Sequence, residues 1–189
     1  MEDLERLGKE EENILKGIED WMNHDIEAMI SGGCNVSCAT LLGIFMEVLG
    51  GITGGLLMEE NKERTRFQDF LTLRWVPREY SILDNKLYRK SKNEGRKKEG
   101  LYEIFRCNLV HTFFFGGLDI ENEPKKPISR CCPEDIPGIQ EANDGSGRLI
   151  IHINDLAYDI KKARDHLFKE IREKDNVYRK NFRKVLTNI

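Results

Sequence analysis

The chain has 189 residues, of which 39% are hydrophobic and 33% charged, and it carries a formal net charge of −3. This length predicts one domain or two small ones, and the clustering of the apolar residues excludes a disordered chain. With 30 basic and 33 acidic residues, the chain also lacks the basic excess by which a protein holds duplex DNA through bulk charge.

The beginning of the chain and its five cysteines indicate a cytoplasmic location. Met1 is followed by Glu2, Asp3 and Glu5, the opposite of the basic segment that opens a secretory signal. An odd number of cysteines without such a signal is typical of free thiols in a reducing compartment.

The first two predicted elements are long helices over residues 2–30 and 34–58. Apolar residues recur mostly at spacings of three and four in the first, which predicts an amphipathic helix. Ser31, Gly32 and Gly33 follow it, and glycine after a periodic run usually ends a helix. The second run is apolar nearly all round, which predicts a central position in the fold.

The second helix contains several glycines, and each lowers the helix propensity by roughly 1 kcal/mol relative to alanine. We expect them to be tolerated where another helix approaches closely. The run is long enough to span a membrane, but Asn35, Glu47 and its small residues favour a helix buried in protein. No association with a membrane is therefore expected. The glycines are Gly43, Gly50, Gly51, Gly54 and Gly55.

Two shorter helices are predicted over residues 61–73 and 78–90. Pro77 separates them, because the residue before a proline avoids helical angles. A basic connector at residues 89–98 follows, and its interpretation stays open between a solvated loop and a contact for phosphate groups. The residues that would contact phosphate, or more widely a nucleic acid, are Lys90, Lys92, Arg96, Lys97 and Lys98.

The next predicted elements are a helix over residues 99–112 and a turn-rich stretch over residues 118–147, which holds four of the five prolines. The β-branched run of residues 148–153 predicts a strand. We expect it to pair with residues 113–118 or 119–120 as a small hairpin with a long loop.

The last predicted element is a helix capped by Asn154 or Asp155, which either runs to Leu186 or breaks near Asp175 and Asn176. Together these elements predict a mainly α fold, a helical bundle of about five or six helices with a small β-hairpin before the C-terminal helix. We expect a single α-helical domain over residues 1–189, with a loop-rich insertion at about 116–147.

Arg106 and His111 are the candidate catalytic residues, because they lie in a strongly apolar run where charged side chains need a reason. Arginine supplies a planar fork of donors suited to phosphate, and histidine exchanges a proton near neutral pH. Metal-independent RNA cleavage needs both, since the 2′-hydroxyl loses a proton and the phosphorane charge is stabilised. On an α-helix, five residues turn roughly 140° beyond a full turn. The two side chains would therefore flank a groove, with Tyr102 and Asn108 at its edge as supporting residues.

The run from Arg106 to His111 resembles the Arg-x4-6-His motif of HEPN domains (higher eukaryotes and prokaryotes nucleotide-binding domains). The surrounding sequence also resembles a group of prokaryotic proteins in which a similar helix follows a Phe-x-x-Phe…Pro-x-x-Tyr segment. The resemblance covers residues 34–169 in outline. The residues that match the segment are Phe67, Phe70, Pro77 and Tyr80.

The resemblance implies an α-helical bundle, often dimeric, in which the motifs of two protomers meet across a two-fold interface. It implies either an endoribonuclease, as in toxin–antitoxin, abortive-infection and CRISPR systems, or a binding or scaffold domain without activity. Arg106 would stabilise phosphate and His111 would act as the acid or base, in a homodimer that acts on RNA. Cys107 departs from the pattern, since active members usually carry a polar residue directly after the arginine.

A structural interpretation of the same residues remains open. In it, Arg106 pairs with a carboxylate such as Glu47 or Glu103, and His111 caps a carbonyl. The chain would then be a non-catalytic helical interaction or scaffold protein.

The cysteines also permit a zinc site, because Cys34-x3-Cys38, Cys107-x3-His111 and Cys131-Cys132 offer ligands. None of these pairs has the tight Cys-x2-Cys spacing of a structural zinc knuckle. Free buried thiols are therefore expected, with no metal and no small-molecule cofactor.

Overall fold

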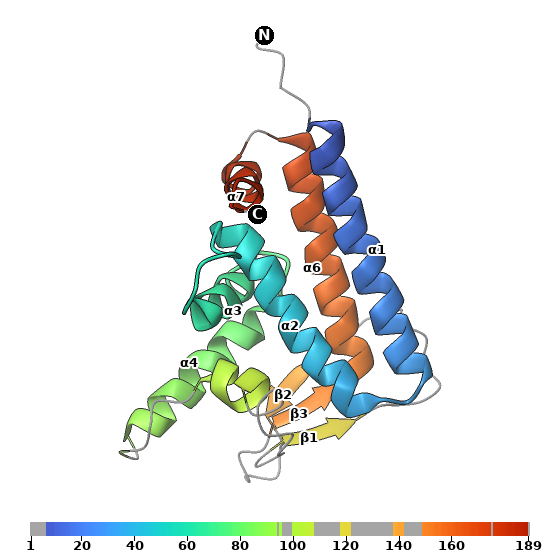
Figure 1. Cartoon of the computed structure of the whole chain (residues 1–189). Helices are drawn as coiled ribbons and strands as arrows, with labels where there is room; N and C mark the ends of the chain where they lie inside the picture. Colours follow the sequence, from blue (N-terminus) through green and yellow to red (C-terminus); the bar gives the residue numbers. More distant parts are fainter. Residues whose placement is uncertain are drawn as a thin grey trace.

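The computed structural model describes residues 7–93, 95, 100–107, 118–121, 138–141, 149–174 and 176–188. Within these ranges the chain forms six α-helices, a π-helical turn and a three-stranded sheet (Figure 1). The predicted mainly helical fold is confirmed. The buried apolar residues of these elements form one continuous core.

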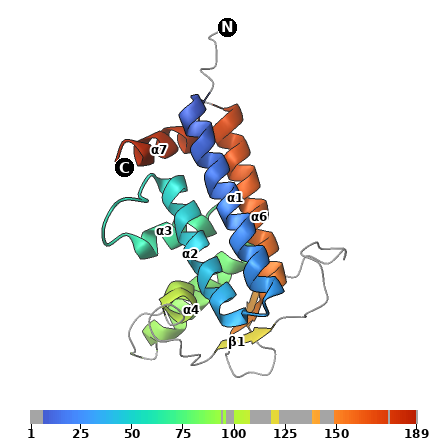
Figure 2. The ribbon, with the colours of Figure 1, turned by 45° about the vertical axis from the view of Figure 1, so that its right-hand side comes forward.

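Two long helices, α1 (Lys9–Ser31) and α6 (Ile153–Glu173), lie side by side and antiparallel (Figures 1 and 2). Polar contacts join them at both ends. Arg172 Nε lies 2.8 Å from Glu12 Oε1 at one end, and Lys161 Nζ lies 3.2 Å from Glu27 Oε1 at the other. The predicted end of the first helix is confirmed, because Gly32 caps α1 and Gly33 has φ +66°.

Helix α2 (Asn35–Gly54) is the central element, and it packs against α1, α3, α6 and α7. It ends at Gly55, which adopts the left-handed conformation with φ +67° that glycine favours. The predicted close approach at its glycines is confirmed at Gly50. A Cβ added there would lie 1.7 Å from the carbonyl oxygen of Arg66 in α3.

Helix α2 is also long and apolar enough to cross a membrane by length and composition alone, and 61% of its most apolar window is buried inside the protein. Eleven of its residues are buried, from Cys38 to Ile52. A helix surrounded by four others needs an apolar surface on every side, so its position in the bundle accounts for its composition.

Helices α3 (Glu63–Leu71) and α4 (Arg78–Asn93) follow, joined by a turn at residues 72–77 that contains Pro77. Phe67 and Phe70 of α3 and Tyr80 of α4 are fully buried. Both helices match the predicted ones apart from two or three residues at their ends.

The sheet differs from the predicted hairpin. Strand β3 (Leu149–His152) pairs in parallel with β1 (Leu118–Glu121) and antiparallel with β2 (Ile139–Glu141), in the order β1-β3-β2. The hairpin before the last long helix is therefore β2–β3. The expected pairing with residues 119–120 occurs, but it is parallel and so cannot form a hairpin. The antiparallel partner comes from the stretch that was expected to be irregular.

The expected cap of the last long helix was also wrong. Strand β3 runs directly into α6, so His152, with φ −86° and ψ 99°, takes the cap position in place of Asn154 or Asp155. Of the two alternatives that the sequence left open for this helix, the break is the one that occurs, because α6 ends at Glu173 and α7 (Val177–Leu186) begins after Asn176.

Side chains of α7 stabilise this break. Asn176 Oδ1 accepts a hydrogen bond from the backbone N–H of Arg179 at 3.1 Å, which caps α7. The buried guanidinium of Arg179 donates to the carbonyls of Ile171 and Arg172, at 2.7 Å each. These carbonyls end α6 and lack partners within the helix, so a cation there is favourable for the helix dipole as well.

The contact at Gly50 leads to a stability prediction. We expect Gly50→Ala to lower the free energy of unfolding by about 3 kcal/mol or more, because α3 must move away from the new methyl group. Gly17→Ala, on the exposed face of α1 with no atom within 4 Å, is the control and should raise it by roughly 0.5–1 kcal/mol. Urea unfolding of both variants measures the difference, and equal stabilities would contradict the close packing.

The pairing of Glu11 with Arg183 predicts a dependence of stability on pH. Arg183 Nε lies 2.7 Å from Glu11 Oε1, and this hydrogen bond lowers the pKa of Glu11 from its usual 4.5, against the opposing effect of burial. A carboxyl whose pKa is lowered by folding contributes stability above its ordinary pKa, and that stability is lost as the pH falls through the folded value.

We therefore expect Glu11→Gln to be less stable than the wild type at neutral pH, and the difference to shrink as the pH falls below 4.5. Glu10→Gln, at an exposed position in the same turn, is the matched control. Urea unfolding across this pH range measures the effect. A difference that stays constant with pH would show that the pair does not act through ionisation.

Candidate functional site

The predicted site lies partly within the described residues. Arg106 belongs to a π-helical turn, η1 (Tyr102–Cys107), which the structure has where a regular α-helix was expected. Turns of this kind are rare and occur frequently at functional sites. The supporting residue Asn108 and the candidate acid or base His111 lie outside the described residues, as do Arg96, Lys97 and Lys98.

The start of η1 is fixed by two carboxylates. The backbone N–H of Leu101 donates to Asp84 Oδ1 of α4 at 2.6 Å, and that of Gly100 donates to Glu103 Oε2 at 2.9 Å. Asp84 is 8% exposed. A Cβ on Gly100 would lie 2.5 Å from Asp84 Oδ1, so the absence of a side chain at residue 100 allows this arrangement.

Arg64 joins η1 to the two helices beside it. Its Nη1 lies 2.7 Å from Glu103 Oε1, and its guanidinium carbon lies 5.4 Å from the centre of the Tyr88 ring on α4. Since Arg64 belongs to α3, one side chain connects α3, α4 and η1. Such a contact over an aromatic face is worth about 0.5–1 kcal/mol at an exposed site.

The apolar side of η1 packs on α3. Leu101 and Phe105 are fully buried, and the ring centres of Tyr102 and Phe67 are 5.5 Å apart. Tyr102 was expected at the edge of a groove, but it is only 9% exposed. The reason is the adjacent Phe67, whose edge-on contact with the Tyr102 ring is favourable beyond area burial alone. Tyr102 is therefore a core residue that supports the turn.

The two carboxylates proposed as structural partners of Arg106 have other cations near them. Glu103 pairs with Arg64, as above. Glu47 Oε1 in α2 lies 3.9 Å from Arg66 Nη2 of α3, and both side chains are largely buried. Each carboxylate thus already has an arginine from α3 as a neighbour.

Two of the predicted phosphate-contacting residues are described. Lys90 and Lys92 are exposed near the C-terminal end of α4. They follow Asp84, which anchors η1, by six and eight residues. At 1.5 Å of rise per residue they lie roughly 9 and 12 Å from it along the helix axis. The helix that carries the two exposed lysines thus also anchors, through Asp84, the start of the turn that contains Arg106.

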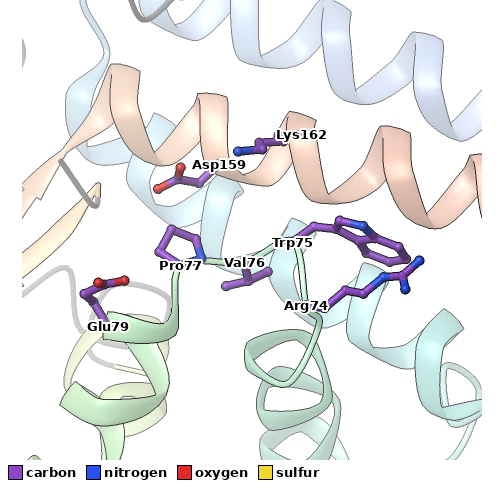
Figure 3. Close-up of a pocket in the computed structure, with 7 residues that line it drawn as sticks. All are labelled: Arg74, Trp75, Val76, Pro77, Glu79, Asp159 and Lys162. Atoms are coloured by element: carbon purple, nitrogen blue, oxygen red, sulfur yellow. The ribbon is translucent and has the colours of Figure 1, made fainter. Parts of the chain in front are cut away.

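A hollow that the sequence did not predict lies between α6, the turn at residues 72–77 and the start of α4 (Figure 3). Its volume is about 410 Å³. Asp159 in its wall is 2% exposed, and its Oδ2 accepts hydrogen bonds from Tyr80 Oη at 2.5 Å and the Gly138 N–H at 3.2 Å. The lining residues are Arg74, Trp75, Val76, Pro77, Glu79, Asp159 and Lys162.

The charges of this hollow do not converge on one point. Two basic and two acidic side chains line it, and Figure 3 shows Arg74 beside the Trp75 ring, directed away from Lys162. Arg74 Nη2 also lies 2.7 Å from Glu170 Oε1, and Trp75 stacks on His166 with ring centres 5.5 Å apart. The only sequence signal for the hollow was the helix break at Pro77.

The predicted free thiols are described in part. Neither Cys34 nor Cys38 is in a disulfide, and Cys38 is buried as expected, but Cys34 at the start of α2 is exposed, so its expected burial was wrong. Among the residues that the structure describes, no group of three or more His, Cys, Asp or Glu side chains is arranged to hold a metal ion. The remaining candidate zinc ligands lie outside the described part of the chain. They are Cys131, Cys132, His111 and the side chain of Cys107.

In comparisons with known proteins, no family model matches the chain, and no curated protein or solved structure shows significant similarity to it. The chemistry of the residues and the geometry around them therefore carry the functional argument.

The anchor of η1 leads to a prediction about Asp84. We expect Asp84→Ala to lower the free energy of unfolding by about 1–3 kcal/mol, because the buried N–H of Leu101 loses its acceptor. Asn85→Ala, at the neighbouring exposed position, should change it by no more than about 0.5 kcal/mol. Urea unfolding of the two variants measures both effects, and similar losses would show that the hydrogen bond to η1 is not important.

Proposed function

We propose that this chain is a HEPN-like protein that acts on RNA as a metal-independent endoribonuclease, with Arg106 and His111 as its catalytic residues. The observation that carries the proposal is the π-helical turn at Arg106, anchored to α3 and α4 through Arg64, Asp84 and Glu103. A rigid base of this kind holds a functional side chain better than a free loop does.

The type of turn also supports the proposal. π-helical turns are rare and occur frequently at functional sites, and Arg106 lies within this one, which runs from Tyr102 to Cys107.

In the proposed reaction, His111 removes the proton of a ribose 2′-hydroxyl, and the 2′-oxygen attacks the adjacent phosphorus atom. Arg106 stabilises the charge that develops on the phosphoryl oxygens. The bond to the 5′-oxygen of the next nucleotide breaks, which leaves a 2′,3′-cyclic phosphate and a 5′-hydroxyl. Lys90 and Lys92 would contact phosphates of the RNA, and a homodimer would bring two motifs together.

A non-catalytic helical interaction protein is the second candidate. The observation that favours it is Cys107, which occupies the position directly after the arginine where active HEPN domains usually have a polar residue. In this case the anchored turn would support a binding surface rather than a reaction.

Incubation of the purified protein with single-stranded RNA in EDTA tests the proposal. We expect cleavage with 2′,3′-cyclic phosphate ends, and we expect His111→Ala and Arg106→Ala each to lower the rate by at least about 100-fold. The matched controls are His24→Ala and Arg78→Ala, which change the same residue types at exposed positions of α1 and α4. Their rates should stay within about twofold of the wild type.

Two results would contradict the nuclease. The first is equal cleavage by the wild type and His111→Ala, which would indicate a contaminating enzyme or another mechanism. The second is a wild-type protein that leaves RNA intact. If that protein still binds RNA, the non-catalytic candidate is favoured in the form of an RNA-binding module.

A further inference from the structure

The first turn of α2 contains two cysteines in very different surroundings. Cys34 is exposed and occupies the cap position, with φ −85° and ψ 62°, so its backbone is not yet helical. Cys38 is fully buried. The N–H of Cys38 donates to the carbonyl of Cys34 at 2.8 Å, so the two residues are one helical turn apart on the same side of α2.

We propose that Cys34 and Cys38 are a thiol pair that a hydroperoxide oxidises to an intrahelical disulfide, with Cys34 as the residue that reacts first. Residues one turn apart in a helix have Cβ atoms about 5–6 Å apart, whereas a disulfide needs about 3.5–4.5 Å. The first turn must therefore tighten by roughly 1–2 Å. Helical side chains also point back toward the N-terminus, which directs Cys38 toward Cys34.

The chain before the pair gives the freedom that this movement needs. Gly32 and Gly33 precede Cys34. Gly33 has φ +66°, and a Cβ added to it would have no other atom within 4 Å. Cys34 Sγ now lies 3.6 Å from the carbonyl oxygen of Gly32, a weak contact that rotation about one bond removes. Cys34 can thus turn toward Cys38 without unfolding of the helix behind it.

The chemistry takes place in two steps. The Cys34 sulfur attacks one oxygen of the hydroperoxide, the O–O bond breaks, and Cys34 becomes a sulfenic acid while the peroxide is reduced to an alcohol or water. The Cys38 sulfur then attacks the Cys34 sulfur. The S–S bond forms, and the hydroxyl leaves as water with the thiol proton.

The second step should be slow, because the attacking thiol is buried. Burial, with a smaller contribution from the nearby Cys34, raises the pKa of Cys38 to about 12. The thiolate is the nucleophile, so little of Cys38 is reactive at neutral pH. The Cys34 sulfenic acid should therefore persist long enough to be trapped by dimedone.

The sequence allows a direct test. Between Lys16 and Lys62 the chain contains no Lys or Arg, so trypsin releases residues 17–62 as one peptide that holds both cysteines. The folded protein is treated with hydrogen peroxide, and free thiols are then blocked with N-ethylmaleimide. After digestion with trypsin, the mass of the peptide is measured by mass spectrometry before and after reduction. We expect a species that has lost two hydrogen atoms and carries no maleimide, and dithiothreitol should reverse this change.

Three variants sharpen the test. Cys34→Ser should abolish both the disulfide and the dimedone adduct, while Cys38→Ala should abolish the disulfide and increase the adduct. Alanine is chosen at residue 38 because serine would bury an extra hydroxyl. Cys131→Ser is the matched control and should leave the 17–62 peptide unchanged.

Either of two outcomes would overturn the proposal. One is a peptide in which Cys34 is oxidised to the sulfinic acid and no disulfide forms. The other is a peptide in which both cysteines still take up maleimide after peroxide treatment.

Discussion

The contact between the backbones of α2 and α3 at Gly50 is the constraint on which the rest of the structure depends. Only the missing side chain lets the carbonyl of Arg66 approach so closely. At that distance the Arg66 guanidinium reaches back to the Glu59 carbonyl, 2.8 Å away, and closes the α2–α3 connection. The same placement buries Phe67, and Phe67 is the surface on which Tyr102 and the rest of η1 pack. The turn that carries Arg106 is thus positioned indirectly by a glycine more than fifty residues earlier.

The other half of the bundle depends on arginines rather than on close backbone contact. Arg172 and Arg183 pair with carboxylates of α1, and Arg179 ends α6 from inside the core. A buried guanidinium is stable there because carbonyl oxygens replace its lost water, which a lysine could not do with the same geometry. The three arginines belong to a basic stretch over residues 169–184. Its cations hold α1, α6 and α7 together.

Local patterns predicted α1, α2, α3 and α4 closely, because each of these helices depends mainly on its own sequence. The stop of α1 at Gly32 follows from glycine after a periodic run, whereas the sequence left open whether the last helix breaks before Asn176. The sheet could not be predicted in this way. The partners of β3 lie on both sides of it in space, and the choice between parallel and antiparallel pairing depends on chain paths that local periodicity does not contain. The role of Asp84 could not be predicted for the same reason, because Asp84 accepts a hydrogen bond from the N–H of Leu101, seventeen residues later.

The π-helical turn is the feature of the candidate site that sequence patterns were least able to predict. From residue 101 to 107 no proline or glycine forces a departure from the α-helix, and the apolar spacing fits either form. Contacts around the turn hold it in place: Asp84 accepts a hydrogen bond from the Leu101 N–H, Glu103 accepts one from the Gly100 N–H, and the Tyr102 ring packs against Phe67. A π-turn gives up favourable hydrogen-bond geometry, and such local departures persist where the surroundings hold them in place. Here contacts from α3 and α4 through Arg64, Asp84 and Phe67 hold the departure in place, and Arg106 lies within it.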